Sequence, residues 1–263
     1  MHELHFTPDS ILEDIENKSK TMKFYSSDSK VEFVRNQRVI DPKYHQSDIE
    51  YSFNSHGYRT REFADVKDNE FILVFGCSHT EGVGLHEEDI WCSQLCNALG
   101  IDKINLGKAG SGHDVQYLNT VQYIKNKYPM PKMVIYQWPQ ITRRGFSFVK
   151  DNSIEISHYT VSGTSDDKLN SKWYLKRYCG EPGEREMLAY SNYTAANELW
   201  KAHGVPVYNW TWLGDFESMF VDLKEVETKD TGRARDMMHD GADIHSQVVE
   251  QIKPDIDKML NWC

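Results

Sequence analysis

The sequence lacks the features that mark membrane, exported and disulfide-bonded proteins. No apolar run in its 263 residues approaches the roughly 20 residues that cross a bilayer. The N-terminal stretch has neither the basic start nor the apolar core of a signal peptide. The five cysteines form no CxxC pair and no dense framework. We therefore expect a soluble chain with reduced thiols, cytoplasmic when synthesised and not inserted in a membrane.

Positive charge is also scarce. The chain has 30 Lys and Arg residues against 40 Asp and Glu residues, which gives a formal net charge of -10. Nucleic acids and anionic membranes attract proteins through a positive field, so we expect no nucleic-acid partner. Hydrophobic residues make up 39% of the chain and charged residues 27%, and this balance indicates a folded core rather than disorder.

Short apolar runs alternate with amphipathic stretches along most of the chain. The run FILVFG at 71–76 is apolar throughout, which is typical of a strand buried on both faces. Strands joined by helices need crossover connections, which favour a parallel sheet covered on both faces. We predict a three-layer α/β/α sandwich with a mostly parallel, flavodoxin-like sheet. The predicted strands are 71–76, 103–106, 132–138 and 205–210, and the predicted helices are 87–99, 113–127, 184–203 and 244–261.

Two regions do not follow this alternation. Residues 1–65 are polar with scattered aromatic residues, and residues 145–183 carry Gly, Ser, Asp and aromatic residues without a clear period. We predict that 1–65 form an N-terminal extension packing on the core, that 66–263 form one domain, and that the region near 145–183 is an insertion over the mouth of the site.

A serine and an Asp-His pair are the residues most suited to chemistry. Ser78 follows the first buried strand, at the edge where ligands bind to parallel sheets. Asp236 and His239 lie three residues apart near the far end of the chain, so in a turn the carboxylate could orient the imidazole, which could act as the base for the serine. Alternatively, Ser78 caps the following loop and the DxxH stretch is a polar surface turn.

Other chemistries are less well supported. His239, Asp240, Asp243 and His245 could be a metal cluster, but His245 stands at the start of the last predicted helix, where a cap or an exposed side chain is commoner. Cys77 could rival Ser78 as a nucleophile, but alternation along the strand sends it to the opposite face, where we expect it to be buried. The glycine-bearing loops match neither the dinucleotide nor the P-loop fingerprint, so we expect no cofactor.

Four short sequence blocks follow one another along the chain: NSHGYR at 54–59, GCSHTEG at 76–82, NLGKAG at 105–110 and DMMH at 236–239. In this order they resemble the SGNH, or GDSL, hydrolase superfamily of esterases and lipases. The stretch at 54–59 is similar to the N-x-x-G-[FY]-R sequence of bacterial and phage members, and the block at 76–82 has Cys77 where the family usually has Asp. The resemblance implies a triad of Ser78, Asp236 and His239, with the amides of Ser78 and Gly107 in the oxyanion hole.

The third block of the family is altered. The family usually shows Gly-x-Asn-Asp after the third strand, whereas this chain has Gln137, Trp138, Pro139 and Gln140, followed by Arg143. Pro139 falls at the position of the Asn, whose side chain is an oxyanion donor, and proline has no donor group. We expect Gln137 or Gln140 to supply an amide instead, and Trp138 and Arg143 to contact the substrate. A Trp followed by an Arg in this way resembles some phage-like and bacterial branches.

Two functions therefore remain open from the sequence. The first is a serine esterase that removes short acyl groups, with acetyl esters of carbohydrates or other small molecules as substrates. The second is an SGNH-fold module with weak or no catalysis that binds glycan or has a structural role, for example as a virion component of a phage. The altered third block and Cys77 in the first block motivate this alternative.

Overall fold

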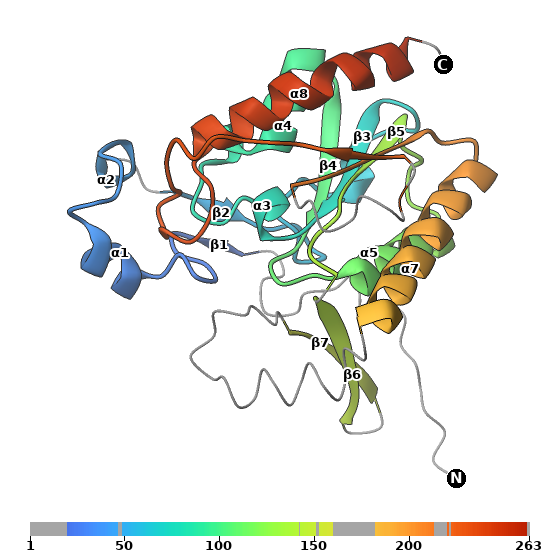
Figure 1. The fold of residues 1–263 in the computed structure, drawn as a ribbon, viewed down its shortest axis with the longest axis horizontal. Helices are drawn as coiled ribbons and strands as arrows, with labels where there is room; N and C mark the ends of the chain where they lie inside the picture. The colour runs from blue at the N-terminus through green and yellow to red at the C-terminus, as the bar shows by residue number, and fades with distance from the viewer. Residues whose placement is uncertain are drawn as a thin grey trace.

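A computed structural model describes residues 20–46, 49–141, 143–150, 153–159, 182–212, 220 and 222–261. Its centre is a sheet of five parallel strands in the order β4-β3-β5-β8-β9 (Figure 1). Relabelled in chain order, this is the 2-1-3-4-5 order of flavodoxin-like sheets, which confirms the predicted fold class. The strands are β3 (Phe71–Gly76), β4 (Asp102–Gly107), β5 (Met133–Gln137), β8 (Val207–Thr211) and β9 (Leu223–Glu225).

Helices cover both faces of the sheet because the strands carry apolar residues on both sides. On β3, Ile72 and Val74 face one cluster and Phe71, Leu73 and Phe75 face the other. The first cluster is covered by α4 (Trp91–Leu99) and α8 (Ala242–Leu260), which pack against each other. The second is covered by α5 (His113–Lys125) and α7 (Pro182–Ala202) (Figure 1). The predicted three layers are therefore confirmed.

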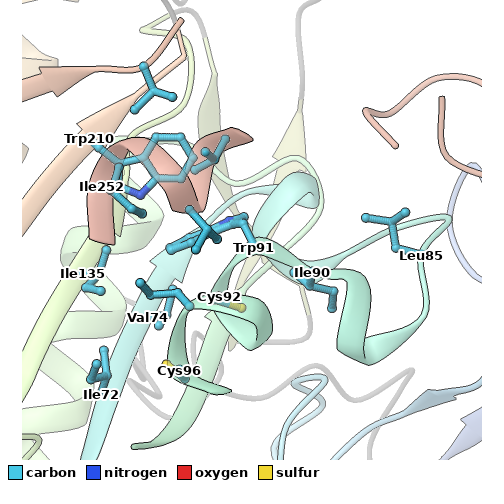
Figure 2. Packing of buried hydrophobic residues seen from close by; sticks show 14 of the residues in the cluster. Ile72, Val74, Leu85, Ile90, Trp91, Cys92, Cys96, Ile135, Trp210 and Ile252 are labelled. Atoms are coloured by element: carbon cyan, nitrogen blue, oxygen red, sulfur yellow. The ribbon is translucent and has the colours of Figure 1, made fainter. Parts of the chain in front are cut away.

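Large side chains fill the layer between the sheet and the helices α4 and α8. Trp91 at the start of α4 and Trp210 on β8 pack edge to face with 4.9 Å between ring centroids. Ile135 on β5 and Ile252 on α8 belong to the same cluster and are fully buried (Figure 2). Cys92 and Cys96 also lie in this layer as free thiols, as the sequence predicts.

Helix α5 differs from its prediction. Apolar spacing predicts that Val115, Leu118, Val121, Tyr123 and Ile124 are buried. Val115 and Tyr123 are, but the other three are only partly buried, and polar residues share the buried face. The polar residues are hydrogen-bonded: Asn119 Nδ2 donates to the hydroxyl of Tyr58, and Gln116 Nε2 donates to the carbonyl of Gln137. These bonds engage the side-chain NH2 groups, whereas Gln116 Oε1 and Asn119 Oδ1 have no hydrogen-bond partner among the described residues. The buried polar face of this helix is therefore only partly satisfied.

The remaining elements lie outside the central sheet. Residues 20–65 contribute β1 (Thr21–Met22), α1 (Lys30–Asn36), α2 (Lys43–Gln46) and β2 (Tyr51–Ser52), and they add Tyr44, Ile49 and Tyr51 to the core. The division of the chain near residue 65 stays a prediction. An antiparallel pair, β6 (Arg144–Lys150) and β7 (Ser153–Tyr159), falls in the region that showed no clear period. The rest of that region, 160–181, lies outside the described residues.

The strand order reverses between β3 and β5, so the crevice at their carboxyl ends is where a ligand binds in sheets of this kind. The short helix α3 (Ser78–Glu81), which the sequence did not reveal, begins at this edge. Within the part of the chain that is described, no helix combines the length and apolar character needed to cross a membrane.

The central strand β5 offers a test of the core. We expect Ile135→Ala to lower the free energy of unfolding by about 2–5 kcal/mol, because the side chain is fully buried and its removal leaves a cavity. Val31→Ala is the control, since Val31 is exposed and should change stability by less than about 0.5 kcal/mol. Urea denaturation of both variants measures the difference, and equal losses would contradict this packing.

Candidate active site

Ser78 lies at the turn between β3 and α3. The strand ends at Gly76, where a Cβ would lie 2.0 Å from Thr80 Oγ1, so only glycine allows this close approach. Ser78 begins α3 and has 6% of its surface exposed. Among the described residues, its hydroxyl makes no hydrogen bond, and neither its amide nor that of His79 donates one. A hydroxyl and two amides therefore remain available at the start of this helix.

Gln137 holds this turn from the neighbouring strand. Its Oε1 accepts hydrogen bonds from the amide of Cys77 at 3.1 Å and from Thr80 Oγ1 at 3.2 Å. Its Nε2 donates to the carbonyl of Trp138. Both ends of the side-chain amide are therefore used inside the core, which corrects the expectation that Gln137 is an oxyanion donor. Cys77 is buried, as predicted, with its Sγ 3.2 Å from Gln137 Oε1.

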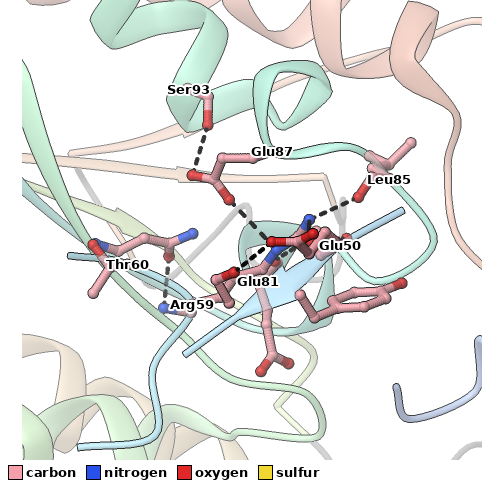
Figure 3. A network of polar contacts seen from close by, with 12 residues as sticks. Glu50, Arg59, Thr60, Glu81, Leu85, Glu87 and Ser93 are labelled. Carbon is pink, nitrogen blue, oxygen red and sulfur yellow. Dashed lines mark hydrogen bonds and ion pairs between the residues drawn. The ribbon is translucent and has the colours of Figure 1, made fainter. Parts of the chain in front are cut away.

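The buried Arg59, from the N-x-x-G-[FY]-R stretch, holds the chain that follows α3. Its Nη1 donates to the carbonyl of Gly82 at 2.7 Å, and its Nη2 donates to the carbonyls of Leu85 and Glu50 at 3.0 Å (Figure 3). The guanidinium also lies over the ring of Tyr51. The motif therefore has a structural role next to Ser78, which its sequence alone did not indicate.

The Asp-His pair stands in a hairpin formed by residues 232–241. Arg233 and Asp240 form an isolated antiparallel bridge, and the amide of Ala234 donates to the carbonyl of His239. Inside the hairpin, His239 Nδ1 donates to Asp236 Oδ2 at 2.6 Å. This geometry fits the predicted role of the carboxylate as the group that orients the imidazole.

The hairpin packs against the segment that carries Ser78. The amide of Arg235 donates to the carbonyl of Gly84 at 3.0 Å, three residues beyond α3. The rings of His79 and His239 lie edge to face with 5.1 Å between centroids. Asp240 Oδ2 lies 3.5 Å from His79 Nδ1. The structure thus brings the Asp236–His239 pair against the residue next to Ser78.

Burial and hydrogen bonding set the charges of this cluster. Burial opposes the ionisation of Asp236, but hydrogen bonds from His239, Ser27 and the Met238 amide outweigh it and hold the pKa of Asp236 below its usual value. Burial, with a contribution from the neighbouring His239, lowers the pKa of His245 to about 3. It also holds the pKa of His79 well below its usual range. Asp236 is therefore an anion, and the two histidines beside the pair are neutral at pH 7.

The structure corrects the expectation that the amide of Gly107, at the end of β4, contributes to an oxyanion hole. The amide of Gly107 donates to Asn105 Oδ1 at 2.8 Å, so it is not available to a substrate. In the same loop Ser111 Oγ donates to the carbonyl of Gly76, which ties the loop to the end of β3. The amide of Gly110 makes no hydrogen bond within the described residues, and its φ of 77° is one that glycine adopts without strain. Gly110 thus offers a free amide at this edge of the sheet.

The aromatic residue at the site is also not the expected one. Trp138 has no exposed surface and donates through Nε1 to Asn209 Oδ1 at 2.8 Å, so it cannot stack on a sugar ring as predicted. Trp212 is partly exposed instead, and its ring centroid lies 4.6 Å from that of His79. Gln140 is partly buried, and no contact of its side chain defines a role. Arg143 is partly buried, and its Nε and Nη1 have no hydrogen-bond partner among the residues that the structure describes.

Two residues of the site, His79 and Ser27, were not predicted from the sequence. His79 stands next to Ser78 in the chain, which is the one hint it offered. Ser27 donates through Oγ to Asp236 Oδ2 at 2.7 Å across a separation of 209 residues, and no local pattern links the two.

His245 differs from its prediction. It was expected to cap a helix or be exposed, but it is fully buried, and its Nδ1 accepts from the amide of Trp91.

Comparison with known proteins finds similar folds at low identity. No protein-family model matches the chain, and no curated protein does. A member of the lipolytic protein G-D-S-L family from Veillonella parvula is 14% identical over 72% of this chain and 73% of its own, with a TM-score of 0.32. The acetyl xylan esterase Est2A from Butyrivibrio proteoclasticus is 12% identical over 75% of this chain and 66% of its own, with a TM-score of 0.48. A carbohydrate acetylesterase family member from Sinorhizobium meliloti is 13% identical over 73% of this chain and 99% of its own, with a TM-score of 0.43.

The role of Arg59 is open to a direct test. Arg59→Met keeps a long apolar stem but leaves the carbonyls of Glu50, Gly82 and Leu85 without a donor, so we expect a loss of about 2–4 kcal/mol of unfolding free energy. Arg61→Met is the matched control, because its ion pair with Asp102 is exposed and contributes at most about 1 kcal/mol. Similar losses of unfolding free energy in the two variants would contradict this structural role of Arg59.

The buried His245 predicts a dependence of stability on pH. Between pH 6.5 and about 3 the unfolded chain binds a proton at this residue and the folded chain does not, so stability falls as the pH falls. His245→Asn keeps an acceptor for the Trp91 amide but does not titrate. From pH 7 to pH 5 we expect the wild type to lose about 2 kcal/mol more than this variant.

Denaturation at the two pH values measures this difference. His203→Asn is the control, because His203 is exposed and its replacement should leave the pH dependence of stability unchanged. If His245→Asn loses as much stability as the wild type on acidification, His245 is not held neutral by burial.

Proposed function

We propose that the chain is a serine esterase of the SGNH type with Ser78 as nucleophile, His239 as general base and Asp236 as the group that orients it. The observation that carries the proposal is the 2.6 Å contact between His239 Nδ1 and Asp236 Oδ2, in a hairpin packed against the residue next to Ser78. An Asp-His pair that acts on a serine hydroxyl is the arrangement that activates the hydroxyl for attack on an acyl carbon.

The reaction proceeds in two steps. His239 Nε2 takes the proton of Ser78 as Oγ bonds to the ester carbonyl carbon, and the same proton then goes to the alcohol oxygen as the ester C–O bond breaks. The acyl group is left on Ser78. Water attacks the acyl carbon while His239 takes its proton, and that proton returns to Ser78 Oγ as the carboxylic acid leaves. The ionised Asp236 stabilises the imidazolium that forms in each step.

The oxyanion of each tetrahedral intermediate needs donors. We assign the amides of Ser78 and Gly110 to this role, because neither makes another hydrogen bond within the described residues and they follow the carboxyl ends of β3 and β4. Pro139 supplies none, and loss of one such donor typically slows an acyl transfer by about 100- to 1000-fold. The guanidinium of Arg143, in the loop after β5, has Nε and Nη1 unpaired among the described residues, and we assign it to substrate contact.

A short acyl group suits this site best. Ser78 is nearly buried, and the ring of His79 next to it contacts those of Trp212 and His239, which favours a short acyl group over a long one. The net charge of -10 disfavours polyanionic substrates and leaves neutral esters unaffected. We therefore propose acetyl esters, with acetylated carbohydrate as the substrate class.

The second candidate is a glycan-binding or structural module with little catalysis. Pro139 at the position of the usual oxyanion amide is the observation that favours it. This alternative predicts that both the wild type and His239→Ala bind an array of acetylated glycans without releasing acetate. Acetate release from any of these glycans by the wild type but not by His239→Ala would exclude it.

Two neighbouring substitutions test the nucleophile. We expect Ser78→Ala to abolish hydrolysis of p-nitrophenyl acetate and labelling by a fluorophosphonate, because no hydroxyl remains to attack. Cys77→Ala is the matched control and should retain both, since Cys77 is buried and faces Gln137. Unchanged hydrolysis in Ser78→Ala, or labelling that disappears only in Cys77→Ala, would contradict Ser78 as the nucleophile.

A further inference from the structure

We propose that Ser27, near the N-terminal end of the described chain, is a positioning residue for the Asp236–His239 pair. The proposal rests on the proposed function, because it assigns Ser27 a part in the same catalytic machinery. Ser27 Oγ donates to Asp236 Oδ2 at 2.7 Å, the same oxygen that accepts from His239 Nδ1 at 2.6 Å. Ser27 therefore acts on the imidazole through the carboxylate and not by contact with the reacting atoms.

The contact completes the hydrogen bonding of a buried carboxylate. Asp236 is 2% exposed, and its Oδ1 accepts from the amides of Met238 and His239, both at 3.1 Å. Its Oδ2 accepts from His239 and Ser27. A carboxylate has about four acceptor sites, so these four donors fill it. Only Ser27 comes from outside the hairpin, and it fixes the plane of the carboxylate relative to the rest of the molecule.

A tight turn presents the Ser27 hydroxyl. Tyr25 and Asp28 exchange two backbone hydrogen bonds, at 2.9 and 3.0 Å, and form an isolated bridge around Ser26 and Ser27. Ser26 has a φ of 56°, a left-handed conformation that is uncommon for a residue other than glycine. The hydroxyl of Tyr25 accepts from Lys108 Nζ at 2.9 Å, which ties the turn to the loop after β4. Strained backbone of this kind persists where its surroundings hold it in place.

A buried ion pair joins this turn to the hairpin. Arg235 donates through Nε to Asp28 Oδ1 at 2.9 Å and through Nη2 to Asp28 Oδ2 at 2.6 Å, and both side chains are at most 2% exposed. The residues next to this pair in the chain are Ser27 and Asp236. The hydroxyl of Tyr51 donates to Asp28 Oδ2 and accepts from the amide of Gly84. The ion pair therefore sets the distance at which Ser27 meets Asp236.

Removal of the Ser27 hydroxyl should loosen the carboxylate while leaving the rest of the turn in place. Asp236 Oδ2 then has one donor in place of two, and the imidazole loses part of its orientation. Productive geometry requires that groups which act in the transition state are already oriented. Because Ser27 does not contact the substrate, we expect an effect on kcat and little effect on KM.

The experiment compares Ser27→Ala and Ser27→Thr in the full chain. One readout is the kcat and KM for p-nitrophenyl acetate, and the other is the proton NMR resonance of the His239 Nδ1–H, assigned by its loss in His239→Gln. We expect Ser27→Ala to lower kcat by about tenfold to a hundredfold, as fits the loss of a hydrogen bond to a charged group, and to shift or broaden the resonance. Ser27→Thr keeps a hydroxyl and should restore both.

Ser29→Ala is the matched control. Ser29 Oγ caps α1 by accepting from the amide of Glu32, so its loss affects the same segment without touching Asp236. It should leave kcat and the resonance unchanged. If Ser27→Ala does not fold, Ser27→Cys, which has nearly the same size and a weaker donor, should lower kcat and shift the resonance in the same direction.

The two readouts separate the proposals. A wild type without hydrolytic activity would refute the proposed esterase, while the resonance would still decide whether Ser27 orients the pair. Wild-type kcat and an unchanged resonance in Ser27→Ala would overturn the role of Ser27, as would a kcat that Ser27→Thr fails to restore in a folded variant.

Discussion

The candidate site depends on the buried ion pair between Asp28 and Arg235, whose residues stand 207 positions apart in the chain. Each charge is buried among apolar groups, including the rings of Phe24 and Phe33 near the guanidinium, so each needs the other. In the chain, Asp28 directly follows Ser27, and Arg235 directly precedes Asp236. The ion pair therefore holds the turn at 25–28 against the hairpin at 232–241. At this contact the hydroxyl of Ser27 donates to the carboxylate of Asp236.

The sheet contributes the other half of the site. Parallel strands bring the ends of β3, β4 and β5 to one edge, and each end performs a different task there. The turn after β3 presents Ser78, and Gln137 at the end of β5 holds this turn through a hydrogen bond to the Cys77 amide. The loop after β4 carries the amide of Gly110, which makes no hydrogen bond in the described part of the chain. Ser78 and the Gly110 amide, which would act on a substrate, thus come from other strand ends than Gln137, which holds the turn in place. This separation explains why the altered third block leaves the turn at Ser78 intact.

The sequence predicted the features that have a local signal. Four strands and the last helix follow from apolar periodicity, and Ser78, Asp236 and His239 follow from motifs at strand ends and turns. Strand β9 was missed because its residues, Leu-Lys-Glu, form no apolar run. Gly107 ends β4 and Gly110 lies in the loop that follows, and no sequence pattern shows that the amide of Gly107 is already bonded to Asn105. The link between Ser27 and Asp236 is tertiary and has no local pattern.

The most direct test is a crystal structure of the full chain after reaction with a fluorophosphonate. The central claim is that Ser78 is the nucleophile in a site oriented by Asp236 and His239. It predicts phosphorus bonded to Ser78 Oγ, a phosphoryl oxygen within hydrogen-bond distance of the amides of Ser78 and Gly110, and His239 Nε2 facing Oγ. Phosphorus on another residue, or a phosphoryl oxygen turned away from both amides, would contradict it.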